Sequence, residues 1–194
     1  MTVRIHGEYI MTSDTMALVP HLNQYGELWS FGMELNRTIL IRKNPKTILN
    51  DSCKFFGSSY EGRVDGTKAI MNRGKMYPIA ICVPLDMYMF PLVSPNNYTC
   101  VWLSYVHIRD IDAYQTHHAK ITFMNEQQLI VTKSKKLVES KKFRTGELRH
   151  QLKVRSNFDV VAESPLIYQL PQIETDLWNL VLDEKKGTYE VYRR

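Results

Sequence analysis

Strict alternation of apolar and polar residues near the start of the chain is the feature that most constrains the fold. Between positions 29 and 36, every second residue is apolar: Trp29, Phe31, Met33 and Leu35. A period of two places these side chains on one face of a β-strand. Residues 38–42, rich in β-branched side chains, indicate a second strand. The first third of the chain is therefore expected to form β-structure.

Further elements follow from capping signals and short apolar runs. Asn44-Pro45 is typical of a helix start, and Gly57 of its end, so a short helix is predicted between them. Ser134 and Thr145 are each expected to cap a short basic helix. Further strands are predicted at 79–83, 87–90, 101–114 and 120–132, the last interrupted by a hairpin loop at 125–128.

Residues 57–76 contain four glycines in 20 positions, mixed with basic residues. This composition predicts a long functional loop with little regular structure. Residues 156–171 are expected to be irregular. Ile173, Leu177, Leu180 and Val181 then share one face of a predicted amphipathic helix that ends at Gly187. The predicted fold class is α+β, a largely antiparallel β-sheet with a few short helices, the last an amphipathic C-terminal helix.

Positive charge is concentrated in one segment. The net charge is +5, but residues 133–155 alone hold nine Lys and Arg against two Glu, and residues 156–194 are net acidic. Such a basic segment suits the neutralisation of phosphates, although a solvated helix face explains it equally well. The chain is thus expected to divide into an α+β domain at 1–155 and a regulatory or assembly tail at 156–194.

Composition and motifs argue against several classes of protein. No apolar run approaches the roughly 18–20 residues of a membrane span, and no secretory signal is visible, so a cytoplasmic protein is expected. Gly57–Val64 has the glycine spacing of a phosphate-binding loop, but Arg63 and Val64 replace its Lys and Ser/Thr. His107, His117 and His118 lack companions at metal-ligand spacing. The expectation is a non-enzymatic protein without metal or cofactor.

The segment Cys53–Arg63, CKFFGSSYEGR, is distinctive. It resembles the signature of the bacterial competence transcription factors, the ComK family. Trp102–His107 and the Arg144-Thr145 and Leu148-Arg149 pairs resemble later family motifs in the same order. The resemblance covers about residues 50–150.

This resemblance implies a transcriptional activator of DNA-uptake and recombination genes, associated with the nucleoid. Such proteins bind paired A/T-rich boxes as dimers or tetramers, contact the minor groove, bend the DNA and affect RNA polymerase indirectly. The resemblance also implies an adaptor that delivers the protein to a Clp protease. Leu166, Ile167 and Tyr168 correspond to the M-L-Y of the family's F-M-L-Y-P-K adaptor motif, while Pro165 and Gln169 depart from it.

Candidate DNA-binding residues are the basic ones near the signature and in the charged segment: Lys54, Arg63, Arg73, Lys75, Lys133, Lys135, Lys136, Lys141, Lys142, Arg144 and Arg149. Arg63 is the leading candidate for reading the minor groove, because it is expected on a thin glycine-rich loop and the chain shows no convincing helix-turn-helix. Phe55 and Phe56 are expected in the core rather than between bases.

Two alternatives remain open from the sequence. The chain could be a protein-interaction module with a basic face for an acidic partner, or a small enzyme that holds phosphate in the Gly57–Gly62 loop. Salt-dependent binding to random duplex DNA separates an activator from an interaction module.

Overall fold

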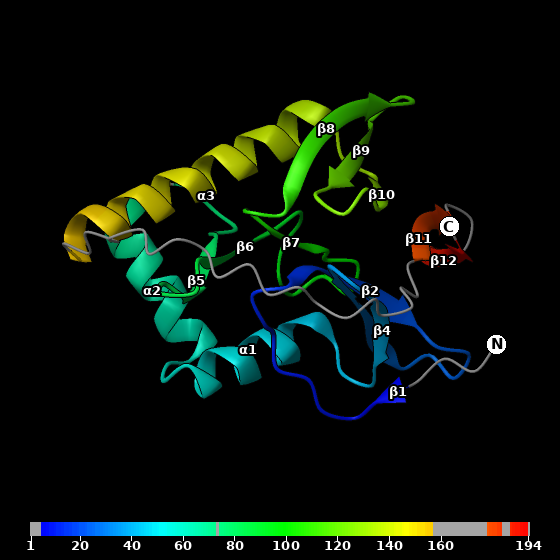
Figure 1. Ribbon diagram of the computed structural model, residues 1–194, viewed down its shortest axis with the longest axis horizontal. Coiled ribbons are helices and arrows are strands. Elements are labelled where there is room, and N and C mark those ends of the chain that lie inside the picture. Colours follow the sequence, from blue (N-terminus) through cyan, green and yellow to red (C-terminus); the bar gives the residue numbers. More distant parts are fainter. Residues whose placement is uncertain (1–4, 73, 157–177, 184–186, 194) are drawn as a thin grey trace, which may run out of the picture.

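A computed structural model describes residues 5–72, 74–156, 178–183 and 187–193. These residues form two β-sheets and three helices (Figure 1). Neighbouring strands are antiparallel, except for the parallel pairs β1–β4 and β10–β11. The predicted α+β class with a largely antiparallel sheet is confirmed.

The large sheet has the strand order β1-β4-β3-β2-β7-β6-β5, and the small sheet the order β12-β11-β10-β9-β8. The strands of the large sheet are β1 (Ile5–His6), β2 (Thr15–Leu22), β3 (Leu28–Glu34), β4 (Thr38–Ile41), β5 (Ile79–Cys82), β6 (Met87–Pro91) and β7 (Trp102–Ser104). Those of the small sheet are β8 (Ile108–Tyr114), β9 (His118–Phe123), β10 (Gln128–Val131), β11 (Trp178–Asp183) and β12 (Thr188–Arg193).

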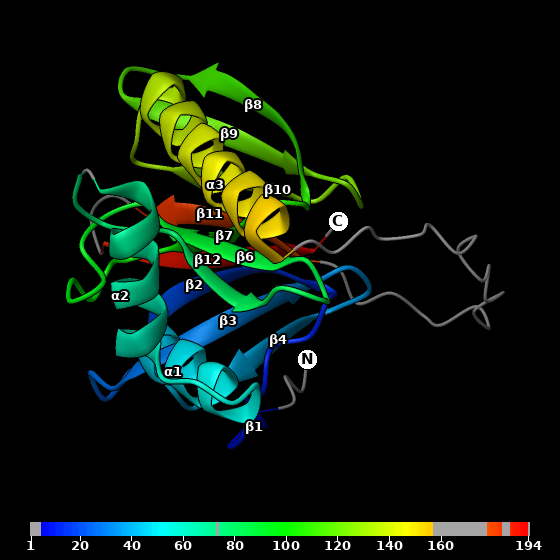
Figure 2. The same cartoon turned by 90° about the vertical axis from the view of Figure 1, so that its left-hand side faces the viewer.

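The three helices are α1 (Pro45–Phe55), α2 (Tyr60–Met71) and α3 (Lys135–Ser156). Helix α1 packs on one face of the large sheet, and α2 contacts the edge strand β5. The small sheet and α3 cover the opposite face. Figure 2 shows all three helices on one side of the molecule.

The large sheet is apolar on both faces, which explains this layered arrangement. Along β6, Met87 and Met89 join the cluster beneath α1, while Tyr88 and Phe90 point to the opposite side. This is the two-residue period of a strand whose two faces are both covered. Trp102 of β7 is completely buried on the α1 side, with its ring edge-on to Tyr60.

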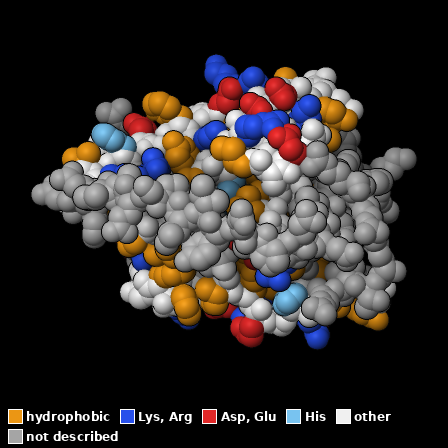
Figure 3. All heavy atoms as spheres, in the orientation of Figure 1, with side chains coloured by type: hydrophobic (Ala, Val, Ile, Leu, Met, Phe, Trp, Pro, Cys, Tyr) orange, Lys and Arg blue, Asp and Glu red, His pale blue; other side chains and the backbone are white. Residues whose placement is uncertain are grey.

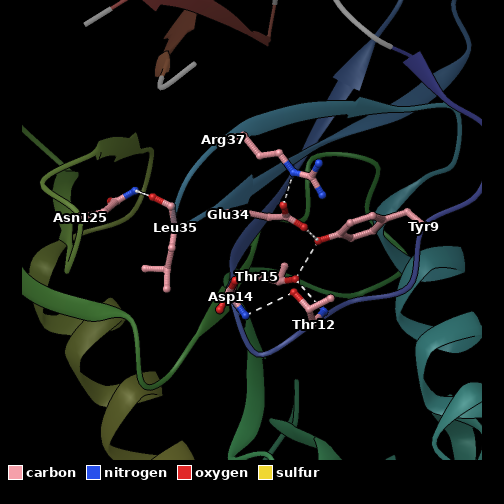
Figure 4. A network of polar contacts seen from close by, with 8 residues as sticks. All are labelled: Tyr9, Thr12, Asp14, Thr15, Glu34, Leu35, Arg37 and Asn125. Atoms are coloured by element: carbon pink, nitrogen blue, oxygen red, sulfur yellow. Dashed lines mark hydrogen bonds and ion pairs between the residues drawn. The ribbon is translucent and has the colours of Figure 1, made fainter. Parts of the chain in front are cut away.

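A polar network ties the start of the chain to the large sheet (Figure 4). The Tyr9 hydroxyl donates to Glu34 Oε1 at 2.8 Å, and Arg37 Nε donates to Glu34 Oε2 at 2.6 Å. Burial and the nearby Glu34 carboxylate raise the pKa of Tyr9. Asn125 Nδ2 donates to the Leu35 carbonyl at 2.8 Å and so connects the β9–β10 turn to the large sheet.

Local capping explains the α1–α2 connection. Asn44 accepts the Thr47 backbone N–H at 2.9 Å, as expected of an N-cap, and confirms the predicted helix start. At the other end, the N–H groups of Gly57 and Ser58 donate to the carbonyls of Lys54 and Cys53. This is a Schellman motif, and Gly57 has the positive φ, 78°, that it requires.

The predicted loop at 57–76 is wrong, because residues 60–71 form α2. Ser59 is its N-cap and accepts the Gly62 N–H at 3.0 Å. The capping signal was present, but the glycines suggested a loop. Gly62 and Gly66 are exposed, so the helix tolerates them without losing core contacts.

Three further expectations need correction. The two short helices expected in the basic segment are one helix, α3. The strand expected at 101–114 is divided into β7 and β8. The amphipathic C-terminal helix is also wrong, because its described part, residues 178–183, is the strand β11. The backbone of β11 pairs with both β10 and β12, and Leu180 joins the core, so tertiary pairing overrides the helical period.

None of the helices in the described parts of the chain is long and apolar enough to cross a membrane. The proposed division at residue 155 stays a prediction.

Two glycine-to-alanine changes should have opposite effects on stability. Gly57→Ala should lower the free energy of unfolding by about 1 kcal/mol, because an L-residue at this φ is strained. Gly66→Ala should raise it by about 1 kcal/mol, because an added Cβ meets nothing within 4 Å and alanine favours the helix. Urea unfolding measures both. Destabilisation by Gly66→Ala would contradict its assignment to an exposed helical position.

Candidate nucleic-acid interface

The basic residues of α3 divide into those that hold the helix to the protein and those that face solvent. Arg149 belongs to the first group. Its Nε and Nη2 donate to the two carboxylate oxygens of Asp86 at 2.7 and 2.6 Å, and its guanidinium lies over the Tyr105 ring. The hydrogen bond to Asp86 raises the pKa of Arg149 above its ordinary value. This paired geometry assigns Arg149 a structural role.

Other basic residues of the helix also have partners within the chain. Lys142 Nζ donates to the Ile108 carbonyl at 2.9 Å, at the start of β8, and burial lowers its pKa. Lys135 forms an ion pair with Glu139 one turn later, at 3.7 Å. Arg144 Nη1 donates to the Lys75 carbonyl at 3.4 Å.

Lys141 differs from these residues because it is buried and its ammonium lies beside a sulfur atom. Its side chain is only 9% exposed, and Nζ lies 3.9 Å from Met76 Sδ. Burial, reinforced by the positive charges of Arg144 and Lys133, lowers the pKa of Lys141 to about 8. The Cys100 thiol acts weakly in the opposite direction.

Three of the candidate lysines, Lys54, Lys75 and Lys136, are exposed, and Lys133 is half-buried. Within the described residues, no hydrogen bond or ion pair engages the ammonium groups of Lys54, Lys75, Lys133 and Lys136. Lys133 and Lys136 stand at the start of α3, and Lys75 stands in the loop after α2. These lysines are available to phosphates.

Arg63 does not lie on a loop but in the first turns of α2. It is half-buried, and its Nη2 donates to the Phe56 carbonyl at 3.4 Å, across the α1–α2 turn. It also lies close to the buried Cys53 thiol, whose pKa is raised to about 11, mainly by burial. Arg73 and the adaptor residues Leu166, Ile167 and Tyr168 lie outside the described residues.

The expectation that Phe55 lies in the core is wrong. Its side chain is 69% exposed at the C-terminal end of α1, next to the exposed Lys54. Phe56 is partly buried and packs edge-on against it. The signature therefore ends α1 with an apolar ring at the surface. No sequence pattern indicates this exposure, because Phe55 and Phe56 are adjacent and either ring can turn inward.

Helices α1 and α2, with four residues between them including Gly57, form a helix-turn-helix connection that sequence analysis missed. The exposed face of α2 nevertheless suits a major groove poorly. It carries the acidic Glu61 and Asp65, and its Lys68 is paired with Asp65 at 2.8 Å. Carboxylates on this face oppose close approach to phosphates.

The small sheet has a mixed surface instead of a basic one. In Figure 3, Lys and Arg lie among Asp and Glu at the top, where Figure 1 places β8. Arg109 pairs there with Asp110 and Glu126. A hollow of about 600 Å³ between β8 and α3 is lined by equal numbers of cationic and anionic side chains: Arg109, Lys135, Lys142, Asp110, Asp112 and Glu139. This balance gives the hollow no preference for an anion.

In the part of the chain that the structure describes, no group of three or more His, Cys, Asp or Glu could hold a metal ion. His107 is buried, with Nδ1 hydrogen-bonded to Ser104 Oγ at 2.8 Å. This hydrogen bond lies within the Trp102–His107 motif.

A comparison with protein-family models matches residues 6–157 to the family described as ComK protein. The chain belongs to this family. The match includes all three helices and the first ten strands apart from Ile5, so the signature and the basic helix lie within the family's common region.

A curated relative supports the same assignment. The competence transcription factor of Bacillus subtilis (strain 168) is 29% identical over 182 residues, which cover 93% of this chain and 94% of that protein. No solved structure matches the chain. The resemblance to the ComK family is thus confirmed, while the roles of individual basic residues stay predictions.

Lys141→Met should stabilise the folded chain at pH 7 by about 1 kcal/mol, because it removes a buried charge that pairs with no anion in the described parts of the chain. The pKa of Lys141 is about 8 when folded, against an ordinary value of 10.5. Between these values the unfolded chain binds more protons, so wild-type stability rises with pH. The advantage of the variant should therefore shrink between pH 8 and 10.5.

Urea unfolding at pH 7 and pH 10 measures this change. Lys136→Met is the control, because it removes an exposed lysine from the same helix by the same substitution. Equal pH dependence in the two variants would contradict the burial of the Lys141 ammonium.

Proposed function

We propose that this chain is a transcriptional activator of genetic competence that acts by binding duplex DNA and catalyses no reaction. Membership of the ComK family, across residues 6–157, is the observation that carries the proposal. The name of the Bacillus subtilis relative, a competence transcription factor, supports it. The solvent-facing lysines supply the charge that phosphate contacts require.

The proposed target is a pair of A/T-rich boxes, read through the minor groove by a dimer or tetramer. Phe55 is well placed to act there. Minor-groove proteins often insert an apolar side chain between base pairs and so bend the duplex. An exposed phenylalanine beside a lysine, on a turn fixed by Gly57, has the shape and charge for that role.

Arg63 remains a proposed reader of the groove, but its hydrogen bond to Phe56 suggests a different contribution. By binding across the α1–α2 turn, it would hold the tip that presents Phe55. The two residues can therefore be tested together, because one would touch the base pairs and the other would support the turn.

The remaining proposals concern location and control. The protein would work in the cytoplasm at the nucleoid and influence RNA polymerase indirectly. The segment containing Leu166, Ile167 and Tyr168 would bind an adaptor for Clp proteolysis. These proposals rest on the family alone.

Phosphate contacts should appear in the salt dependence of binding. The double variant Lys133→Ala/Lys136→Ala should flatten the slope of log K against log salt by about two units, since each phosphate contact contributes about 0.9. Fluorescence anisotropy on random duplex measures the slope.

The matched control is Arg149→Met, which also removes a positive charge from α3. It should lower the urea midpoint, because Asp86 loses its partner, and leave the slope nearly unchanged. The same slope in the double variant and the wild type would exclude the start of α3 from the interface.

Base analogues test the groove. Inosine·cytosine resembles A·T in the minor groove and G·C in the major groove. A footprint on random-sequence duplex should first locate the boxes. Boxes with A·T replaced by I·C should keep most of their affinity, while G·C boxes should lose roughly 1–3 kcal/mol per replaced pair. I·C boxes that bind as poorly as G·C boxes would show major-groove reading.

Phe55→Ala should reduce this discrimination between A·T and G·C boxes with little effect on folding, because the ring is mostly exposed. Phe143→Ala is its matched control, since Phe143 is equally exposed but lies on α3. Arg63→Ala should reduce discrimination and stability together. Equal effects of the Phe55 and Phe143 changes would argue against insertion of Phe55.

A further inference from the structure

Lys141 is a buried cation that has no anionic partner in the part of the chain the structure describes. Within the described residues, its ammonium contacts only the Met76 sulfur, at 3.9 Å, and no carboxylate forms an ion pair with it. A thioether is a weak hydrogen-bond acceptor. Buried charges in proteins are normally paired, because removal of an ion from water is costly. The fold therefore maintains an unfavourable arrangement at this position.

The surroundings make the arrangement less favourable still. Two further cations, Arg144 and Lys133, lie close enough to lower the pKa of Lys141. The other titratable group that acts on it is the Cys100 thiol, whose own pKa is raised to about 11, mainly by burial. Lys141 thus lies near two other positive charges, and no carboxylate is among the groups that act on it. Such a site attracts an anion from outside.

The loop after α2 holds one of these cations in place. Gly74 has a positive φ of 97°, and a Cβ there would lie only 2.6 Å from Arg144 Nη2. The absence of a side chain lets the guanidinium lie against the loop, where it donates to the Lys75 carbonyl and sits over the Tyr77 ring. Arg144 is therefore positioned before any ligand arrives, which reduces the entropy lost on binding.

The position of the cluster fits a ligand that approaches the helical side. Lys141 and Arg144 join the N-terminal half of α3 to residues 74–77, which follow α2. Helix α2 also contacts α3 directly, and both helices are seen in Figure 2. The exposed Lys136 and Lys75 lie on the same two segments and would add charge around the cluster.

We propose that Lys141, together with Lys133 and Arg144, forms a binding site for a phosphate group. The phosphate comes from the backbone of duplex DNA, and in this respect the inference rests on the function proposed above. A phosphate oxygen would replace the Met76 sulfur as the partner of the ammonium. Because Lys141 is already desolvated, this contact costs less and is electrostatically stronger than a contact to an exposed lysine.

The site would give DNA binding an unusual dependence on pH. A bound phosphate stabilises the charged form of Lys141, so binding requires the proton that free Lys141 loses near pH 8. The raised pKa of Cys100, about 11, keeps the neighbouring thiol neutral throughout this range. Affinity for random duplex should therefore fall between pH 7 and pH 9 through Lys141.

The experiment compares full-length wild type with Lys141→Met, Lys141→Arg and the control Lys136→Met. Anisotropy on random duplex is measured against salt at pH 7 and against pH from 7 to 9. Lys141→Met should flatten the salt slope by about one unit and abolish the pH dependence. Lys141→Arg should retain the slope and also lose the pH dependence, because arginine stays charged. Lys136→Met should flatten the slope but keep the pH dependence.

A second readout uses inorganic phosphate alone. Millimolar phosphate, compared with chloride at equal ionic strength, should raise the melting temperature of the wild type and of Lys136→Met but not that of Lys141→Met. This melting experiment also confirms that Lys141→Met is folded. The wild type could fail to bind DNA and still show this Lys141-dependent rise in melting temperature. The proposed function would then be wrong, but the phosphate site would be supported.

Other results would overturn the site. One such outcome is that Lys141→Met leaves the salt slope and the pH dependence of DNA binding unchanged, while phosphate leaves the wild-type melting temperature unchanged. These results together would show that Lys141 binds no phosphate. A phosphate shift with an unchanged DNA slope would show that the phosphate comes from a free ion or nucleotide, so the assignment to DNA would be wrong. Lys141-dependent binding of polyglutamate without binding of DNA or phosphate would assign the cluster to an acidic protein.

Discussion

The apolar character of both faces of the large sheet determines the rest of the structure. Because β6 sends Met89 to one side and Phe90 to the other, neither face can be left in water. Helix α1 covers one face, and the small sheet and α3 share the other. Since α3 is the most basic segment of the chain, its inner side brings positive charge against the protein body. Asp86 neutralises Arg149, and the Ile108 carbonyl accepts a hydrogen bond from Lys142.

The number of basic residues in α3 is therefore larger than the number whose charge is available to a ligand. Some of its cations pair with groups inside the protein, and others face solvent. Lys136 remains exposed, whereas Lys141 is buried beside Met76 and pairs with no anion among the described residues. Natural proteins tolerate such local costs most often where a site acts on a ligand. Along this one helix, some basic residues thus stabilise the fold, and others are placed to bind a polyanion.

Features determined by neighbouring residues could be predicted from the sequence. Asn44 and Gly57 start and stop α1 through contacts within a few residues, and the alternation around Phe31 identified a strand. Helix α2 was missed because a helix accepts glycine where no side chain is needed for packing. Strand β11 was missed because its pairing with β10 is set by tertiary contact. The burial of Lys141 depends on Met76, 65 positions away, and no local pattern reveals it.

The parallel pairing of β10 with β11 has a consequence for how the chain is made. Leu129 aligns with Leu180, so one edge of β10 finds its partner only after α3 and the segment beyond it have been synthesised. Until then the nascent chain presents an unpaired strand edge, and the core lacks Leu180. Closure of the small sheet is a late, long-range event that proceeds slowly compared with local helix formation. During this interval the newly made protein is exposed to misassembly and to proteases.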